Sequence, residues 1–312
     1  MAYDKEVDDF LLGGDEEDSV KSKKDKSLNL LALCRRVPEC ASVYLPDDGK
    51  VLISMDLSGA EPNMMLNFTK DEMLKFFLKE AAGVDPYWSG KTLMTDSMYI
   101  TFASRNLVGD QLIKKCWEKD WEGMSFSQQY LKDSDVVKKY LDKQNKAYSM
   151  YKMLVLALFY GLGAQGVVRQ IGDYGITLTE EQGKDIHSDF WKLFSGVNSF
   201  QLTLRKLLKH HDYITNPFGF KLNVEPHKVL NAYIQSSVSS FLSVLLIELD
   251  KYPKAEYIAT IHDELVYSLY PEDIPDFLEF RDLKLKDLND SLKFEWPLEL
   301  GMVVGRNFYE AK

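Results

Sequence analysis

Near the C-terminus, two β-rich runs at residues 257–261 and 265–269 flank His262, Asp263 and Glu264. Two such runs separated by three residues predict a β-hairpin. Tight turns usually contain Gly, Asn or Pro, so three ionisable side chains at the tip are an unusual choice. The pattern therefore predicts an antiparallel element with a candidate functional site at its tip.

The hydrophobic pattern of the remaining chain predicts mostly helices. Residues 51–55 form a short apolar run typical of a buried strand, and the run ends at Asp56. Pro62 fits a first helical position, so a helix is expected from there to about Lys79. Further helices are expected over 93–117, from about 133, and over 148–160, 164–171, 179–194, 196–211, 229–249 and 273–290, with a hairpin over 213–224 and a last strand over 297–304.

This order of elements favours an α+β fold. A strand, many helices, a hairpin and a closing strand predict a small antiparallel sheet with helices and a helical insertion. Residues 1–27 are polar and contain separate acidic and basic runs, so we expect a flexible N-terminal segment there.

The net charge of −10 disfavours nucleic-acid binding, but its distribution weakens that argument. Residues 1–20 hold eight acidic residues and one lysine, whereas lysines gather at 21–26 and at 132–152. Local basic patches matter more for phosphate binding than the total charge. The alternative to phosphate binding is that the lysines of each patch lie on a helix face exposed to solvent.

Cysteine usage and the N-terminus favour a cytoplasmic protein. Cys34, Cys40 and Cys116 lack CxxC spacing, so reduced thiols are expected rather than a zinc site. The N-terminus has no secretory pattern. We expect no apolar run as long as a membrane span.

Asp56 and Asp263 each follow a predicted strand, so the sheet could bring the two carboxylates together. Uncompensated carboxylates would repel each other, whereas two magnesium ions bridged by them would catalyse an in-line displacement. For either aspartate alone, a turn or a helix cap is the more common role.

The helix expected over 148–160 contains a single charged residue, Lys152. Tyr148, Lys152, Leu156 and Tyr160 follow one another at four-residue spacing and share a face. A positively charged side chain next to aromatic rings is suited to bind a nucleotide, because the charge attracts the triphosphate and a ring provides a surface on which the base stacks. A lysine that snorkels beside core tyrosines is the alternative.

Seven motifs, in order, resemble the polymerase region of the family A DNA polymerases, the bacterial DNA polymerase I family. They are Asp56-Leu-Ser-Gly-Ala-Glu61 (family DYSQIE), Lys152 with Tyr160-Gly161 (Kx7YG), Arg169-Gln170 (RQ), Phe190-Trp-Lys-Leu-Phe-Ser-Gly-Val197 (YFxxYPGV), Asn231-Ala-Tyr-Ile-Gln235 (NxxxQ), Ile261-His262-Asp263-Glu264-Leu265-Val266 (VHDEL), and Trp296-Pro-Leu-Glu299 through Asn307-Phe-Tyr-Glu310. Together they span about residues 28–312.

The resemblance implies a right-hand polymerase palm with a helical fingers insertion. It places a first part of the palm at 28–80, the fingers at 81–225 and a second part of the palm at 226–312. It implies a DNA polymerase that uses two Mg²⁺ ions, with Mn²⁺ as a possible substitute, and that binds primer-template DNA and dNTPs.

The same resemblance implies a role for each matching residue. Asp56, Asp263 and the Leu57 carbonyl would hold the metals, and Glu264 would support them. Glu61 would exclude the ribose 2′-hydroxyl, Lys152 would contact the phosphates, Leu156 would lie beside the sugar, and Tyr160 would stack near the templating base. The residues that would contact DNA are Gln235, His262, Gly161, Arg169 and Asn231.

The sequence also departs from the family pattern. Tyr148 stands where the family has an arginine, Met98 aligns near its histidine, and Gly219-Phe220-Lys221 replaces its GRR-like stretch. The family places a thumb, and often an exonuclease domain, before this region. We therefore expect both to be absent here and to be supplied by a second polypeptide, as in some bacteriophage polymerases acting in the host cytoplasm.

Two other functions remain open from the sequence. A replication subunit that binds DNA or a partner without synthesis would explain the missing arginine and histidine. A metal nuclease or phosphatase could use the same carboxylates, but it would explain Lys152 and Glu61 poorly.

Overall fold

The structure is a computed structural model that describes residues 42, 44–75, 78–79, 146–261 and 263–311, with only the backbone described for 146–152. The helices expected over 93–117 and from 133, the three cysteines, Met98 and the N-terminal segment lie outside these residues. The chain divides into two compact units. We call Met1–Met55, Pro253–Phe277 and Met302–Lys312 the sheet unit, and Asp56–Tyr252 and Leu278–Gly301 the helical unit.

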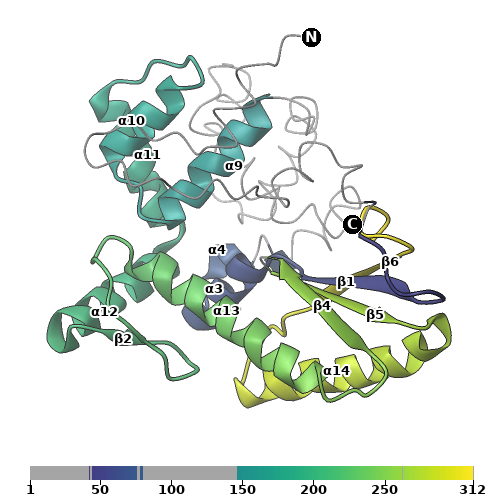
Figure 1. The fold of residues 1–312 in the computed structure, drawn as a ribbon. Helices are drawn as coiled ribbons and strands as arrows, with labels where there is room; N and C mark the ends of the chain where they lie inside the picture. Colours follow the sequence, from purple (N-terminus) through teal and green to yellow (C-terminus); the bar gives the residue numbers. More distant parts are fainter. Residues whose placement is uncertain (1–41, 43, 76–77, 80–145, 262, 312) are drawn as a thin grey trace, which may run out of the picture. The chain divides into compact units, whose positions relative to one another are not determined.

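The sheet has four strands in the order β4-β5-β1-β6 (Figure 1). The strands are β1 (Val51–Leu57), β4 (Glu256–Ile261), β5 (Glu264–Leu269) and β6 (Leu300–Gly305). The last residues of β1 and the first of β6 belong to the helical unit. The α+β prediction is therefore confirmed for the described residues.

The β4–β5 hairpin is antiparallel, as predicted, but its tip is shorter than expected. Glu264 pairs with Ile261, so only positions 262 and 263 connect the strands, and the prediction of a three-residue tip is wrong. The register shifts between Tyr257 and Ala259, which leaves Ile258 without an opposite residue on β5.

Aromatic packing anchors the root of this hairpin. The fully buried Tyr267 ring lies 5.8 Å from the Tyr257 ring and 5.4 Å from that of Phe277. Ile53 and Met55 on β1 are also fully buried. Such burial is the main force that holds strands of this length together.

The helical unit contains most of the remaining elements. They are α3 (Ala60–Thr69), α4 (Glu72–Lys75), α9 (Lys146–Phe159), α10 (Ala164–Gly172), α11 (Glu180–Leu193), α12 (Ser195–His211), β2 (Ile214–Thr215), β3 (Lys221–Leu222) and α13 (Val229–Leu249). The 3₁₀ turn η4 (Pro271–Asp273) belongs to the sheet unit, and α14 (Ile274–Ser291) begins there and continues in the helical unit. The hairpin predicted over 213–224 is confirmed, because β2 and β3 pair antiparallel.

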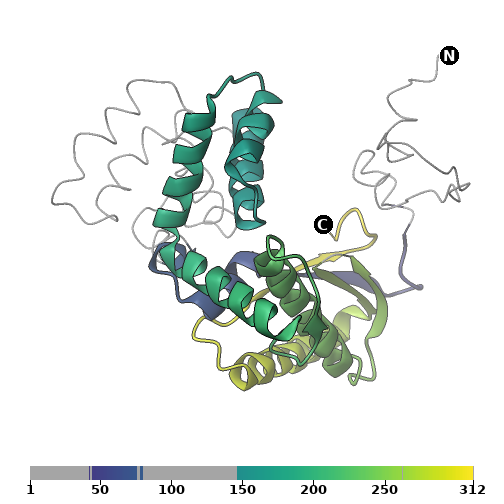
Figure 2. The ribbon, with the colours of Figure 1, turned by 90° about the vertical axis from the view of Figure 1, so that its left-hand side faces the viewer.

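Local sequence signals explain where several helices begin. Thr179 caps α11 by accepting the Gln182 backbone N–H, while the Gln182 side chain accepts the Thr179 N–H. α10 and α11 pack side by side (Figure 2). α13 packs against α3 and α12.

α13 is long and apolar enough to cross a membrane by length and composition alone. The prediction that no run reaches that length is therefore wrong. Ten of its residues are nevertheless buried, and core helices share these properties.

Two predicted helices differ from the structure. The helix expected to continue to Lys79 stops at Thr69, because Lys70 adopts a left-handed conformation with φ 49°, and Pro62 is the third helical residue rather than the first. α9 begins at Lys146 and ends at Phe159. Met153 on this helix is 50% exposed.

Candidate active site

A hydrogen bond joins two predicted nucleotide-site residues within the helical unit. The Tyr160 hydroxyl donates to the carboxylate of Glu61, although the residues lie 99 positions apart. Glu61 is the second residue of α3, and Tyr160 directly follows α9. Both side chains are half-buried. The first and second motifs therefore meet at these two side chains.

Gly161 shapes the turn that presents Tyr160. Its φ is +90°, a conformation that favours glycine. A Cβ at this position would lie 2.3 Å from the His227 carbonyl oxygen. The glycine of the Kx7YG-like motif is therefore required both by its backbone angle and by a close neighbour.

A second hydrogen bond links β1 to the start of β5 within the sheet unit. The buried Ser54 hydroxyl donates to the Glu264 carboxylate. Ser54 precedes Asp56 by two residues, and Glu264 follows Asp263. Ser54 was not among the predicted site residues, although a polar residue within an apolar strand was an available signal.

The predicted metal ligands occupy strand ends. Asp56 is exposed on β1, Leu57 is buried, and Asp263 is half-buried just before β5. Because Asp56 belongs to the helical unit and Asp263 to the sheet unit, the convergence of their carboxylates stays a prediction. Within the described residues, no group of three His, Cys, Asp or Glu side chains is placed to hold a metal ion.

The predicted DNA contacts differ in exposure. Arg169 on α10 and Gln235 on α13 are exposed. Asn231, one turn before Gln235, has a buried Oδ1 with no hydrogen-bond partner in the described part of the chain. Leu156 is half-buried on α9, whereas His262 and the Lys152 side chain lie outside the described residues.

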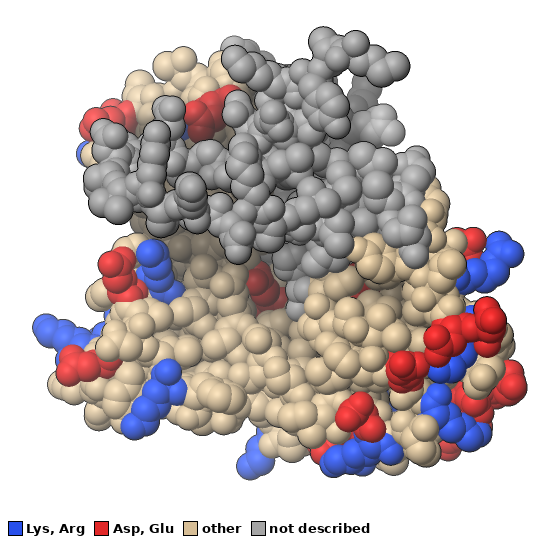
Figure 3. Space-filling model, in the orientation of Figure 1, with Lys and Arg blue, Asp and Glu red and all other residues tan. Residues whose placement is uncertain are grey.

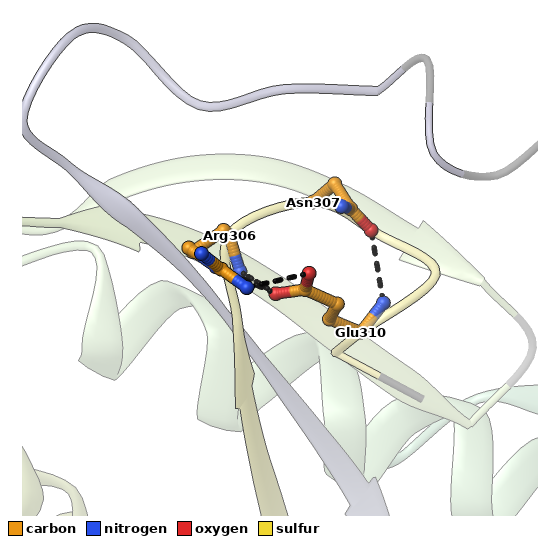
Figure 4. A network of polar contacts seen from close by, with 3 residues as sticks. All are labelled: Arg306, Asn307 and Glu310. Carbon is orange, nitrogen blue, oxygen red and sulfur yellow. Dashed lines mark hydrogen bonds and ion pairs between the residues drawn. The ribbon is translucent and has the colours of Figure 1, made fainter.

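Among the described residues on the face shown in Figure 3, the Lys and Arg side chains lie among those of Asp and Glu. Hydrogen bonds join Arg306, Asn307 and Glu310 at the end of the C-terminal motif (Figure 4). The Arg306 backbone N–H and Nε donate to Glu310 Oε2 at 3.0 and 3.2 Å, and Asn307 Oδ1 accepts the Glu310 N–H at 2.9 Å. The backbone hydrogen bond from Arg306, with its guanidinium, lowers the pKa of Glu310.

Comparisons with known proteins agree on one family. The model of DNA polymerase family A matches residues 135–310. A DNA polymerase of Mycobacterium phage D29 is 33% identical over 117 residues, which are 36% of this chain and 18% of the phage protein.

A solved structure shares the fold. The POL domain of Pol1 from M. smegmatis, in complex with DNA primer-template and dNTP, matches with a TM-score of 0.62 at 16% identity. That match covers 87% of this chain and 42% of the mycobacterial chain. The chain thus spans less than half the length of either relative.

Proposed function

Because this chain belongs to DNA polymerase family A, we propose that it adds deoxynucleotides to a primer 3′-hydroxyl under the direction of a template. The observation that carries the proposal is the hydrogen bond from Tyr160 to Glu61. It joins the residue proposed to stack near the templating base to the residue proposed to test the sugar. A site that reads base and sugar together is what a template-directed enzyme needs.

We assign the sugar test to Glu61 and Leu156. The Tyr160 hydroxyl holds the Glu61 carboxylate, so the position proposed for the 2′ carbon is filled by a fixed side chain. A ribose hydroxyl there would meet a carboxylate that already has a partner. Selection of this kind depends on a group that does not move away.

The donor set proposed for metal binding is chemically suited to magnesium. Asp56, Asp263 and the Leu57 carbonyl supply oxygen atoms, which Mg²⁺ prefers. Glu264, held by Ser54, keeps a further carboxylate next to Asp263. Bound metal ions would stabilise the charge on the attacking and leaving oxygens.

The proposed reaction is a single displacement at phosphorus. The primer 3′-hydroxyl releases its proton to solvent as its oxygen forms a bond to the α-phosphorus of the dNTP, and the bond from that phosphorus to the bridging oxygen breaks. Pyrophosphate leaves with the electron pair, and Lys152 contacts its phosphates and supplies a proton. Tyr160 positions the base, while Gln235 and His262 contact the primer-terminal pair.

We also assign the first and second parts of the palm to 28–80 and 226–312 and the fingers to 81–225. A second polypeptide is proposed to supply the thumb and the 3′–5′ exonuclease. Primer extension with a trap for released enzyme tests this arrangement. Long products from this chain alone, with no partner added, would overturn it.

Primer extension with Mg²⁺ and dNTPs tests the activity itself. Asp263→Ala should slow incorporation at least about a thousandfold, because several kcal/mol of transition-state stabilisation are lost. Asp276→Ala is the control, since Asp276 is an exposed acid on α14. Circular dichroism confirms that both variants fold. Undiminished synthesis by Asp263→Ala would reject the metal site, and no synthesis by the unmodified chain with its partner would favour a non-catalytic replication subunit.

A further inference from the structure

An apolar groove of about 280 Å³ lies beside strand β4 in the sheet unit. Its lining consists of residues 258–261 of β4, Leu52 of β1, Val266 of β5, and the rings of Tyr44 and Phe308. These two rings pack edge-on with their centroids 6.4 Å apart, so they form a fixed wall. None of the described lining residues is charged. The groove is therefore suited to an aliphatic or aromatic side chain.

Strand β4 is also an edge of the sheet, because among the described strands only β5 pairs with it (Figure 1). An edge strand directs the N–H and C=O groups of every second residue away from its neighbour. In the described part of the chain, residues 256–261 make no backbone hydrogen bond besides those to β5. Native edges are commonly protected by charged residues or proline, but residues 257–261 include neither. The outer edge of β4 is therefore open to an additional strand.

Exposed apolar side chains accompany this edge. Ile258, which has no opposite residue on β5, is 48% exposed and lines the groove. Tyr257 is 38% exposed, and its hydroxyl shares a hydrogen bond with Thr260 Oγ1 at 2.9 Å. In β-strand addition, the main-chain hydrogen bonds of a free edge provide affinity, and pockets for alternate side chains provide specificity. β4 and its groove supply both parts of such a site.

Unbalanced negative charge lies at the root of β4. The Lys50 Nζ donates to Asp47 Oδ2 at 3.1 Å and to Glu256 Oε2 at 2.9 Å, so two carboxylates share one cation. Both acidic side chains are more than half exposed. A Lys or Arg at the corresponding end of an added strand would balance this charge. A second copy of β4 would not, because residues 256–261 contain Glu256 and no basic residue.

We propose that the outer edge of β4 binds an extended segment of a partner polypeptide, which pairs with β4 as an additional strand. An apolar side chain of this segment fills the groove, and a Lys or Arg pairs with Asp47 and Glu256. The inference rests on the proposed function, because the partner is the second polypeptide assigned the thumb and the exonuclease. β4 leads directly into the turn that contains Asp263. The bound segment would therefore hold the partner next to a proposed metal ligand.

The test measures binding of a fluorescein-labelled peptide, Lys-Thr-Val-Thr-Ile-Thr-Lys, to the full chain by fluorescence anisotropy. The peptide alternates Thr with Val and Ile, and a lysine at each end allows either strand direction. We expect saturable binding, together with slower amide hydrogen exchange of residues 256–261. The same peptide with N-methyl groups on its three central residues loses donors to an edge strand, so it should bind at least about tenfold more weakly. Equal binding of the two peptides, or no binding of the first, would overturn the proposal.

Two matched variants place a charge on opposite edges of the sheet. Ile258→Lys should weaken peptide binding on the order of tenfold, because it puts a charge into the groove. Val303→Lys, at a 42% exposed residue of the other edge strand β6, should leave binding unchanged. Circular dichroism confirms that both variants fold. The opposite ranking of the two variants would assign the peptide to β6 and overturn the proposal.

The charge pairing at the root is tested by Asp47→Asn combined with Glu256→Gln. This double variant should weaken binding of the lysine-flanked peptide severalfold and leave unchanged that of a peptide with Gln in place of both lysines. Equal losses for the two peptides would overturn the assigned cation.

Sedimentation equilibrium of the unmodified chain tests the alternative occupant. A dimer that is lost in Ile258→Lys would assign the edge to a second copy of this chain and overturn the proposal. Failure of the proposed function would look different, since the unmodified chain would then incorporate no nucleotide whether or not the peptide binds.

Discussion

The carboxylate of Asp71 accepts the backbone N–H of Gly196 at 2.7 Å across 125 positions of sequence. The same oxygen accepts the Val197 N–H at 3.1 Å, and the other oxygen accepts the N–H groups of Met73 and Leu74 at 3.0 Å. Asp71 is 3% exposed. One buried carboxylate therefore caps the N-termini of both α4 and α12, whose positive ends stabilise its charge.

Asp71→Asn is expected to lower the free energy of unfolding by about 1–3 kcal/mol. The amide keeps the shape, but it loses the charge and turns an NH₂ group toward backbone donors. Urea denaturation measures the change. Glu72→Gln, at an exposed neighbour in the first turn of α4, should change stability by less than about 0.5 kcal/mol. Equal stabilities of the two variants would contradict the shared cap.

Gly196→Ala tests the same contact from its other side. A Cβ at position 196 would lie 2.9 Å from Asp71 Oδ2 and 3.0 Å from its Cα. We expect a loss of about 1–3 kcal/mol, because a buried contact of this kind has little room to relax. Gly172→Ala is the matched control in α10, where an added Cβ meets nothing within 4 Å. That variant should be neutral or more stable by up to about 1 kcal/mol in thermal unfolding.

Tyr160→Phe should weaken discrimination against ribonucleotides without abolishing synthesis. The variant keeps the ring but no longer holds the Glu61 carboxylate. We expect roughly a threefold to tenfold loss in the ratio of kcat/KM for dNTP to that for rNTP, the equivalent of one hydrogen bond of about 1 kcal/mol. Glu61→Ala should lose more than Tyr160→Phe, and Tyr174→Phe, at an exposed tyrosine, should lose nothing. Unchanged sugar selection in Glu61→Ala would reject its assigned role.

Stability should fall in mild acid because of His187. Burial lowers the pKa of this imidazole below its ordinary 6.5, so the unfolded chain binds a proton first as the pH decreases. The contribution is complete above about pH 6.5 and is lost as the pH falls from there toward the lower folded pKa. Relative to His187→Gln, the native chain should lose less than about 1 kcal/mol between pH 7.5 and pH 5, since the ring is only half-buried.

Unfolding by urea at several pH values measures this difference. His210→Gln serves as the control, because His210 is an exposed histidine at the end of α12. A difference between the native chain and His187→Gln that does not vary with pH would contradict the prediction.

Much of the fold was readable from local sequence. α11 has its capping box at Thr179 and Gln182, and α13 was predicted with its observed bounds from a long run rich in Ser and Leu. The β4–β5 hairpin followed from two β-rich runs. Each of these signals lies within the element that it specifies.

The features that were missed depend on distant partners. Nothing near Lys70 marks the end of α3, since no glycine or proline stands there, and the chain turns so that Asp71 reaches Gly196. Likewise, the motifs supplied Glu61 and Tyr160 as separate candidates. Their hydrogen bond becomes visible only when α3 and α9 are placed in space.

The unpaired Ile258 in β4 has a consequence for how this hairpin can vary. Pairing on the tip side, at 259–261, is separated by that residue from pairing on the root side, at 256–257. An insertion or deletion of one residue between α13 and β4 can be accommodated at Ile258, because this residue has no partner on β5. The chain before β4 can therefore change in length while the register of residues 259–261 with β5, next to Asp263, is preserved.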